Sequence, residues 1–193
     1  MNADLENGYA DDPDEAAMII QLAANAGVVG GSIEDATGNP AKPIYGFNLA
    51  VERVAAAAET AHALPFPFTL TARAENFLHG RRDLDDTVRR LQAFASAGAD
   101  VLYAPGLRDL ETIRQVVAAV GKPLNVVMSA ADPELTAQQL AGVGVKRISV
   151  GGALSRLAYA AIRDAAVAMR EGGTFQWVRN TMPTKDLKAI FLP

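Results

Sequence analysis

The sequence predicts an α/β protein built on a parallel β-sheet. Short runs of β-branched and other apolar residues alternate with longer segments that carry apolar residues at helical spacing. Six such strand–helix pairs follow one another, and no linker separates them. Strands that are separated by helices of this length need crossover connections, which place neighbouring strands in parallel.

The expected strands are short, apolar and bounded by turn residues: Asn2–Glu6, Val28–Ile33, Phe66–Ala72, Val101–Ala104, Leu124–Met128 and Arg147–Val150. The expected helices are longer and mostly rich in alanine: Pro13–Ala26, Leu49–Ala63, Leu84–Ala97, Leu107–Val120, Thr136–Val143 and Ala153–Glu171. Asp12 and Pro13 suit an N-cap and a first helical position. Gly27, Gly98 and Gly121 follow helix ends, where we expect left-handed residues.

Six strand–helix units fit either a doubly wound open sheet or part of an eight-unit barrel. The sequence has neither a GxGxxG nor a Walker motif, which weighs against a dinucleotide- or nucleotide-binding fold. The tail contains an apolar segment, Leu187–Leu192, which predicts a terminal helix that packs on this domain or on a partner subunit. We expect residues 1–193 to form a single domain.

The composition is that of a soluble globular protein. Of 193 residues, 50% are hydrophobic and 21% are charged, with a formal net charge of −4. This charge, without any Lys/Arg-rich run, gives no reason to expect a nucleic-acid partner. No apolar run reaches the roughly 20 residues that span a bilayer, so we expect no membrane contact. The absence of cysteine excludes disulfides and thiolate chemistry within the sequence and fits a cytoplasmic location.

Acidic residues stand at the ends of the first two expected strands. Asp4 and Glu6 are two residues apart, so on an extended strand both side chains point to one face. Glu34 and Asp35 end the second strand. Because the carboxyl ends of parallel strands share one edge of the sheet, these acids suit a hard divalent cation such as Mg²⁺. Capping and turn chemistry explain the same acids equally well from spacing alone.

Arg73 and Glu75 end the third expected strand. The fork of Arg73 suits a ligand carboxylate that faces the cation. A metal chelated by a 2-oxo acid would then stabilise the enolate that forms when a bond to the 3-carbon breaks. A structural ion pair between Arg73 and Glu75 is the open alternative. His62, late in a helix, is expected to be a surface or capping residue.

Four blocks of sequence together resemble a known superfamily. They are Asp4-Leu5-Glu6-Asn7-Gly8-Tyr9, Ser32-Ile33-Glu34-Asp35, Thr71-Ala72-Arg73-Ala74-Glu75 and Ala97-Gly98-Ala99-Asp100. Their order and spacing are similar to those of the isocitrate lyase/phosphoenolpyruvate mutase superfamily. The resemblance covers essentially the whole chain, including Glu171-Gly172-Gly173-Thr174-Phe175.

The resemblance implies a (β/α)₈ TIM barrel that binds Mg²⁺ or Mn²⁺. It implies Asp4 and Glu6 as metal ligands, Glu34 as a supporting metal-site and catalytic acid, and Arg73 as a catalytic residue that contacts the substrate carboxylate. Members of the superfamily act on small 2-oxo acids or 2-hydroxy tricarboxylates and break or rearrange C–C or P–C bonds through a metal-bound enolate. They form homo-oligomers, so we expect a dimer or tetramer.

The loop after Glu34 corresponds to the mobile gate of the superfamily, so Asp35 to Phe47 is expected to close over the substrate. We expect Asn39 and Asn125 to contact the substrate, with Lys42 as an alternative polar gate residue. The lyase branch carries a cysteine in this gate, whereas this chain has none. The phosphonomutase and phosphonopyruvate hydrolase branch is therefore the closer match, and isocitrate lyase and methylisocitrate lyase activities are not expected.

The six units correspond to the third through eighth of the superfamily pattern, so the first two are missing. Six units do not close an eight-strand barrel, and the apolar strand edges need another segment or chain to cover them. The chain is thus interpreted as an enzyme, or part of one, and we expect poor solubility and little or no activity from it alone. An inactive binding or scaffold domain and an open-sheet protein with unrelated chemistry are the alternatives.

Overall fold

The computed structural model describes residues 1–191. The chain divides into two compact units, Met1–Val150 and Gly151–Pro193. The first unit holds six strands: β1 (Ala3–Asp4), β2 (Gly30–Glu34), β3 (Thr69–Arg73), β4 (Val101–Tyr103), β5 (Leu124–Val127) and β6 (Arg147–Ser149). Its α-helices are α1 (Pro13–Asn25), α2 (Phe47–His62), α3 (Leu84–Ser96), α4 (Leu110–Ala119) and α5 (Ala137–Gly142). Every strand and helix expected in this region is confirmed, with ends that differ by a few residues.

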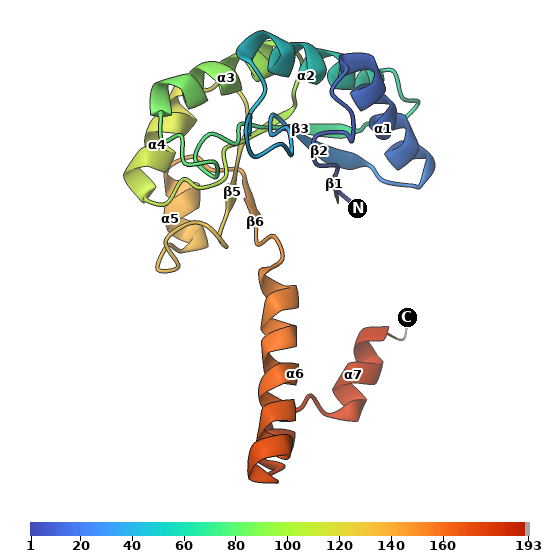
Figure 1. Ribbon diagram of the computed structural model, residues 1–193, viewed down its shortest axis with the longest axis vertical. Helices are drawn as coiled ribbons and strands as arrows, with labels where there is room; N and C mark the ends of the chain where they lie inside the picture. Colours follow the sequence, from blue (N-terminus) through green and yellow to red (C-terminus); the bar gives the residue numbers. More distant parts are fainter. Residues whose placement is uncertain (192–193) are drawn as a thin grey trace. The chain divides into compact units, whose positions relative to one another are not determined.

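The six strands form one parallel sheet in the sequential order β1-β2-β3-β4-β5-β6. The sheet is curled, and helices α1 to α5 follow its outer, convex side (Figure 1). A doubly wound sheet instead reverses its strand order and carries helices on both faces. The architecture is therefore that of a (β/α)₈ barrel of which six units are present.

The two faces of the sheet differ in chemistry because side chains alternate along each strand. On β3, Leu70 and Ala72 are fully buried and belong to the hydrophobic core together with residues of the surrounding helices. The intervening Thr71 and Arg73 lie on the other, concave face. The strand register then places Glu34 beside Arg73, and Arg73 beside Tyr103. The concave face thus becomes polar towards the carboxyl ends of the strands.

The expected helix caps are confirmed at two of the three predicted glycines. The side chain of Asp12 accepts hydrogen bonds from the N–H groups of Asp14 and Glu15, so it is the N-cap of α1. Gly27 and Gly98 are left-handed, with φ of 84° and 108°. The prediction for Gly121 is wrong, because Val120 ends α4 in extended conformation (φ −107°, ψ 142°) and buries its side chain. The chain leaves this helix directly towards β5 without a left-handed turn.

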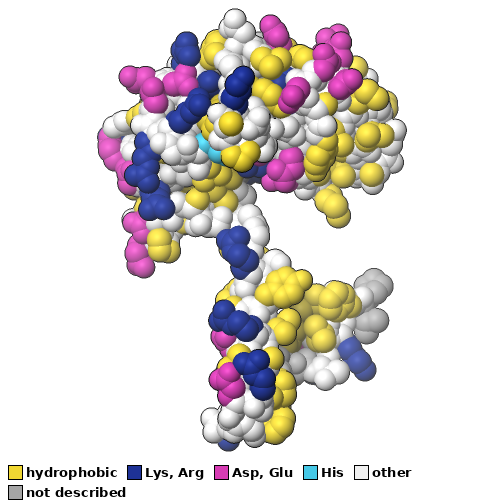
Figure 2. All heavy atoms as spheres, in the orientation of Figure 1, with side chains coloured by type: hydrophobic (Ala, Val, Ile, Leu, Met, Phe, Trp, Pro, Cys, Tyr) yellow, Lys and Arg dark blue, Asp and Glu magenta, His cyan; other side chains and the backbone are white. Residues whose placement is uncertain are grey.

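The second unit consists of α6 (Ala153–Gly172), a 3₁₀ segment (Gln176–Asn180) and α7 (Thr184–Phe191). The expected terminal helix is confirmed as far as Phe191, and Leu192 lies outside the described residues. Within the described part of the chain, neither helix has a buried residue. Apolar side chains gather on the surface of this unit (Figure 2). The exposed large ones on the two helices include Leu154, Leu157, Ile162, Leu187 and Ile190. That residues 1–193 form one domain stays a prediction.

No helix within residues 1–191 combines the length and the apolar character that crossing a membrane requires.

Candidate active site

Arg73, the last residue of β3, lies at the centre of a charged cluster. Its Nη1 donates to both carboxylate oxygens of Asp4, at 2.9 and 2.8 Å. Its Nη2 lies 3.0 Å from Oε2 of Glu34. Its Nε donates to Oε1 of Glu75 at 2.9 Å. The ends of three adjacent strands therefore converge on one guanidinium, and the open-sheet alternative is set aside.

The sheet itself produces this convergence. Glu34 and Arg73 are paired residues at the ends of β2 and β3, and Glu75 follows β3 directly. Asp4 ends β1 and also accepts a hydrogen bond of 3.3 Å from the hydroxyl of Ser32. Parallel strands bring their carboxyl ends to one edge, so residues that are far apart in sequence share one site.

Glu6 departs from the expected strand geometry. The expected strand Asn2–Glu6 ends at Asp4, and Glu6 is left-handed, with φ of 50°. The argument that alternation directs Asp4 and Glu6 to one face therefore fails, because this alternation requires extended backbone. Glu6 nevertheless lies beside the cluster, since its carbonyl oxygen accepts the N–H of Glu34 at 2.9 Å. Its role as a metal ligand stays a prediction.

Two acids of the cluster, Glu34 and Glu75, have shifted pKa values. Burial raises the pKa of Glu34 to about 7, because it outweighs the attraction of Arg73 and is reinforced by Glu75, Glu6 and Asp4. Burial also raises the pKa of Glu75, although Arg73 opposes the shift. Glu34 therefore exchanges its proton near neutral pH, as an acid–base group requires.

The pKa of Arg73 is also shifted, but here the neighbouring charges outweigh burial. Burial disfavours its charged form, but the carboxylates of Glu75, Glu34 and Asp4 outweigh burial and raise the pKa of Arg73. The ring of Tyr103 lies under the guanidinium, 5.1 Å from ring centroid to Cζ. Arg73 is therefore a fixed positive charge surrounded by an excess of carboxylates.

The donor set fits a hard cation. Carboxylate oxygens are the ligands that Mg²⁺ and Mn²⁺ prefer, and Mg²⁺ takes only one or two of them while keeping several waters. Within residues 1–191, no group of three or more His, Cys, Asp or Glu side chains is already arranged around a common metal position. The side chain of Asp4 is 58% exposed, against 11% for that of Glu34, so Asp4 is the more accessible ligand.

Within the described residues, the side chains of the other predicted substrate contacts, Asn39 and Asn125, make no hydrogen bond with this cluster. Asn39 is exposed in the loop after β2, and its side chain accepts the nearby N–H of Ala41 at 2.9 Å. Asn125 is buried on β5, in register with Tyr103, and its Nδ2 donates to Ser149 at 3.0 Å. Its Oδ1 is buried and has no hydrogen-bond partner within the described residues. Asn125 thus has an acceptor without a partner, whereas the side chain of Asn39 is used locally.

Two buried arginines next to the site were not found from the sequence. Arg53 donates to the backbone carbonyl oxygens of Asn7, Ala10 and Asp11, which shapes the loop after β1. Arg90 of α3 pairs with Asp35, the residue after Glu34. The helical spacing could have identified Arg90, because it lies four residues before Phe94 and therefore on the same, buried face of α3.

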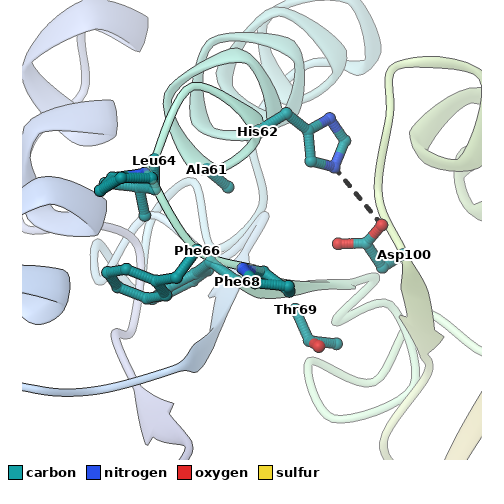
Figure 3. A pocket seen from close by; sticks show the side chains of 9 residues that line it. Ala61, His62, Leu64, Phe66, Phe68, Thr69 and Asp100 are labelled. Atoms are coloured by element: carbon teal, nitrogen blue, oxygen red, sulfur yellow. Dashed lines mark hydrogen bonds and ion pairs between the residues drawn. The ribbon is translucent and has the colours of Figure 1, made fainter.

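A separate cavity of about 580 Å³ lies at the opposite ends of the strands (Figure 3). Its lining includes Thr69, the first residue of β3, and Asp100, which precedes β4. Nε2 of His62 is 3.4 Å from Oδ1 of Asp100, whose other oxygen accepts the N–H of Leu70 at 2.8 Å. His62 ends α2 and its side chain is half exposed, as expected for a surface residue. This end of a barrel serves stability rather than chemistry.

The sequential parallel sheet, its outer helices and the charged cluster at the carboxyl ends of its strands define a TIM-barrel protein with its candidate site in the usual position. The chain belongs to the phosphoenolpyruvate phosphomutase family, whose model matches residues 1–170. The resemblance to the isocitrate lyase/phosphoenolpyruvate mutase superfamily is thereby confirmed.

Similar proteins agree with this assignment. A protein of Burkholderia cenocepacia J2315, described provisionally as a lyase/mutase, is 56% identical, with a TM-score of 0.96 over 100% of this chain and 69% of its own. Oxaloacetate acetylhydrolase, solved with its product oxalate, is 27% identical, with a TM-score of 0.83 over 97% of this chain and 65% of its own. The 2-methylisocitrate lyase of Escherichia coli K12 is 27% identical over 95% of this chain and 63% of its own. The chain thus spans about two thirds of these proteins.

Proposed function

We propose that this chain is a Mg²⁺- or Mn²⁺-dependent lyase or phosphonomutase-type enzyme that acts on a small 2-oxo acid or its phosphonate. The observation that carries the proposal is the convergence of Asp4, Glu34 and Glu75 on Arg73 at the carboxyl ends of the strands. The proposal keeps the cytoplasmic location that the cysteine-free sequence favours.

Asp4, Glu6 and Glu34 would hold the metal, directly or through water, and the bound metal would stabilise the negative charge of an enolate. Arg73 would bind the carboxylate of the substrate through its fork of donors. Its contact with Asp4 is the one suited to exchange, because Asp4 is the most exposed of its three partners. When Asp4 turns to a cation, Nη1 of Arg73 becomes free for the carboxylate of the ligand.

In the metal-free site Glu34 would hold or release a proton, since burial and the neighbouring carboxylates raise its pKa to about 7. Its Oε2 faces the donor Nη2 of Arg73 at 3.0 Å, so this proton would sit on Oε1. Asn125 would offer its unpaired Oδ1 to a substrate hydroxyl or to a bound water, and Asn39 would contact the substrate from the loop. Oxalate, which resembles the enolate of pyruvate, is the product bound to the similar acetylhydrolase and is a suitable probe.

Turnover tests the proposal. The chain is incubated with Mg²⁺ and, in separate samples, with oxaloacetate, phosphonopyruvate or 2-methylisocitrate, and the products are followed by NMR. Because six strand–helix units alone should have little activity, we expect at most slow conversion of oxaloacetate or phosphonopyruvate, and this conversion should stop when EDTA removes the metal. Absence of turnover together with absence of Mg²⁺-dependent oxalate binding would overturn the proposal.

A second candidate is a catalytically inactive scaffold domain of the same family that self-associates. The exposed apolar side chains of α6 and α7 favour self-association, since such surfaces mark interaction sites. Light scattering after size exclusion measures the oligomer, for which we expect a dimer or tetramer. The scaffold interpretation is favoured if the oligomer forms while oxalate with Mg²⁺ gives no thermal shift.

A further inference from the structure

Arg90 is a buried arginine with three acceptors. It lies on α3, and the exposed fraction of its side chain is 6%. Its Nη1 donates to Oδ2 of Asp35 at 3.0 Å and to the carbonyl oxygen of Tyr45 at 3.1 Å. Its Nε donates to Oδ2 of Asp86 at 2.8 Å. Asp86 lies on α3 itself, whereas the other two acceptors lie between β2 and α2.

These two acceptors, Asp35 and Tyr45, stand at the two ends of one loop, residues 36–44. The N–H of Tyr45 donates to the carbonyl oxygen of Asp35 at 2.8 Å, and the adjacent Ala36 and Ile44 form an antiparallel bridge. Arg90 therefore fastens both ends of the loop with a single nitrogen. The loop tip does not share this burial, since residues 38–42 are exposed.

The same carboxylate connects Arg90 to the candidate site. Oδ1 of Asp35 accepts the N–H of Glu75 at 2.8 Å, and the N–H of Asp35 donates to the carbonyl oxygen of Arg73 at 3.2 Å. The carboxylate of Glu75 in turn accepts from Nε of Arg73 at 2.9 Å. A continuous path of hydrogen bonds thus runs from Arg90 through Asp35 and Glu75 to Arg73.

We propose that Arg90 is a positioning residue, which fixes the base of loop 36–44 and, through Asp35 and Glu75, the orientation of the Arg73 guanidinium. The inference rests on the proposed function for the ligand that Arg73 binds. Its basis is geometric, because one side of Asp35 faces Arg90 and the other faces Glu75. Loss of Arg90 frees the carboxylate of Asp35 to turn, and Glu75 and Arg73 lose the fixed reference that aligns them.

The test compares Arg90→Met with Arg89→Met in the full chain. Arg89 is the matched control because it is the neighbouring residue and also pairs with Asp86, at 2.6 Å, but its side chain is 61% exposed. Oxalate affinity is measured by calorimetry with Mg²⁺ at a temperature where circular dichroism shows both variants folded. Amide exchange of Tyr45 and Glu75 is measured by NMR.

For Arg90→Met we expect oxalate affinity to fall by about tenfold, as for other residues that orient a ligand-binding group. Both amides should also exchange faster by at least about tenfold, because local opening at the loop base becomes easier. Arg89→Met should stay within about twofold of the parent chain on both measurements. A structural role alone would lower the melting temperature of Arg90→Met and leave the oxalate affinity of the folded protein unchanged.

Unchanged oxalate affinity in folded Arg90→Met would overturn the inference while the proposed function stands. If the parent chain neither turns over a substrate nor binds oxalate with Mg²⁺, the proposed function fails, and the exchange rates of the Tyr45 and Glu75 amides then decide whether Arg90 controls the loop base. If Arg90→Met does not fold, Arg90→Lys replaces it, since lysine keeps the charge but lacks the fork. Arg90→Lys should weaken oxalate binding by about threefold with faster Tyr45 exchange, and no change in either overturns the inference.

Discussion

Two arginine clusters lie side by side at the carboxyl ends of β2 and β3, and they differ in exposure. In the first, Arg73 contacts Asp4, whose side chain is 58% exposed. In the second, Arg90 contacts Asp35, whose side chain is 1% exposed. The same pairing of guanidinium and carboxylate is therefore exposed to solvent around Arg73 and buried around Arg90. We call the first the open cluster (Arg73, Asp4, Glu34, Glu75) and the second the sealed cluster (Arg90, Asp35, Asp86, Tyr45). Burial, rather than residue type, separates the arginine that we propose to bind the ligand from the one that we propose to position it.

The clusters also differ in charge balance. Arg73 contacts three carboxylates, and burial with these like charges raises the pKa of Glu34 to about 7. In the second cluster, burial raises the pKa of Asp35, although the N–H of Glu75 and Arg90 oppose the shift. For Asp86, burial disfavours the charge, but hydrogen bonds from Arg90, Arg89 and Asn76 outweigh it and lower the pKa to about 2. The excess of carboxylates around Arg73 is suited to binding a cation. The donors around Asp86 match its acceptors, which is suited to stabilising the folded structure.

Breaking the sealed cluster should have the largest effect on stability. Arg90→Met leaves Asp35 buried without its counter-charge, which should lower the free energy of unfolding by about 3–5 kcal/mol. Urea unfolding measures the change, and Arg114→Met, in an exposed pair with Glu111, is the control, whose stability should stay close to that of the parent chain. Equal losses in the two variants would remove the distinction between sealed and open clusters.

Breaking the open cluster should instead change ligand binding. Asp4→Asn removes a negative charge from the proposed metal site, and Mg²⁺ affinity should fall by about 10- to 100-fold. The free energy of unfolding should change little, because the side chain is more than half exposed. Calorimetric titration with MgCl₂ measures the affinity, with Asp14→Asn on α1 as the control. Unchanged affinity in Asp4→Asn would reject Asp4 as a metal ligand.

The pKa of Glu34 predicts a pH dependence of stability. Its value is raised from 4.5 to about 7 on folding, so the folded state binds more protons between these values. This contribution to stability is full below pH 4.5 and is lost as the pH rises through about 7. Between pH 5 and pH 8 the parent chain should therefore lose roughly 2 kcal/mol more than Glu34→Gln in metal-free urea unfolding. Parallel pH profiles of the two proteins would contradict the shift.

Asp86 should show the smallest effect, with the opposite sign. Its pKa is lowered on folding to about 2, so its stabilisation is present above 3.8 and is lost as the pH falls through about 2. Asp86→Asn should cost about 1 kcal/mol at pH 7, because the side chain is partly exposed and Asn keeps one acceptor. Denaturant unfolding at pH 7 and pH 2.5 measures it, and an equal cost at both would argue against the shift.

The sequence predicted the fold and the centre of the site for one physical reason. Parallel strands share an edge, so the acids and the arginine that end β1, β2 and β3 had to meet, and Asp4, Glu34 and Arg73 do meet. Glu6 did not follow its expected alternation, because β1 ends two residues earlier and the chain turns. The alternation of side chains holds only within the strand, so it does not extend to residues beyond the end of β1.

The sealed cluster was not predictable in the same way. Asp35, Tyr45 and Arg90 come from a strand end, a loop end and the middle of a helix, and no periodic pattern links these three positions. The buried face of α3 offered a signal at Arg90, but it did not identify the partners. Contacts between loops and helices depend on tertiary packing, which the periodic pattern of a single sequence does not reveal.

Calorimetric titration of oxalate in saturating Mg²⁺ onto the parent chain and Arg73→Lys tests the central claim most directly. Lysine keeps the positive charge but lacks the fork that holds three carboxylates and would bind the ligand. We expect Mg²⁺-dependent binding to the parent chain and an affinity lower by at least about tenfold in Arg73→Lys. Equal affinities, or binding that does not depend on Mg²⁺, would contradict a metal-assisted carboxylate site centred on Arg73.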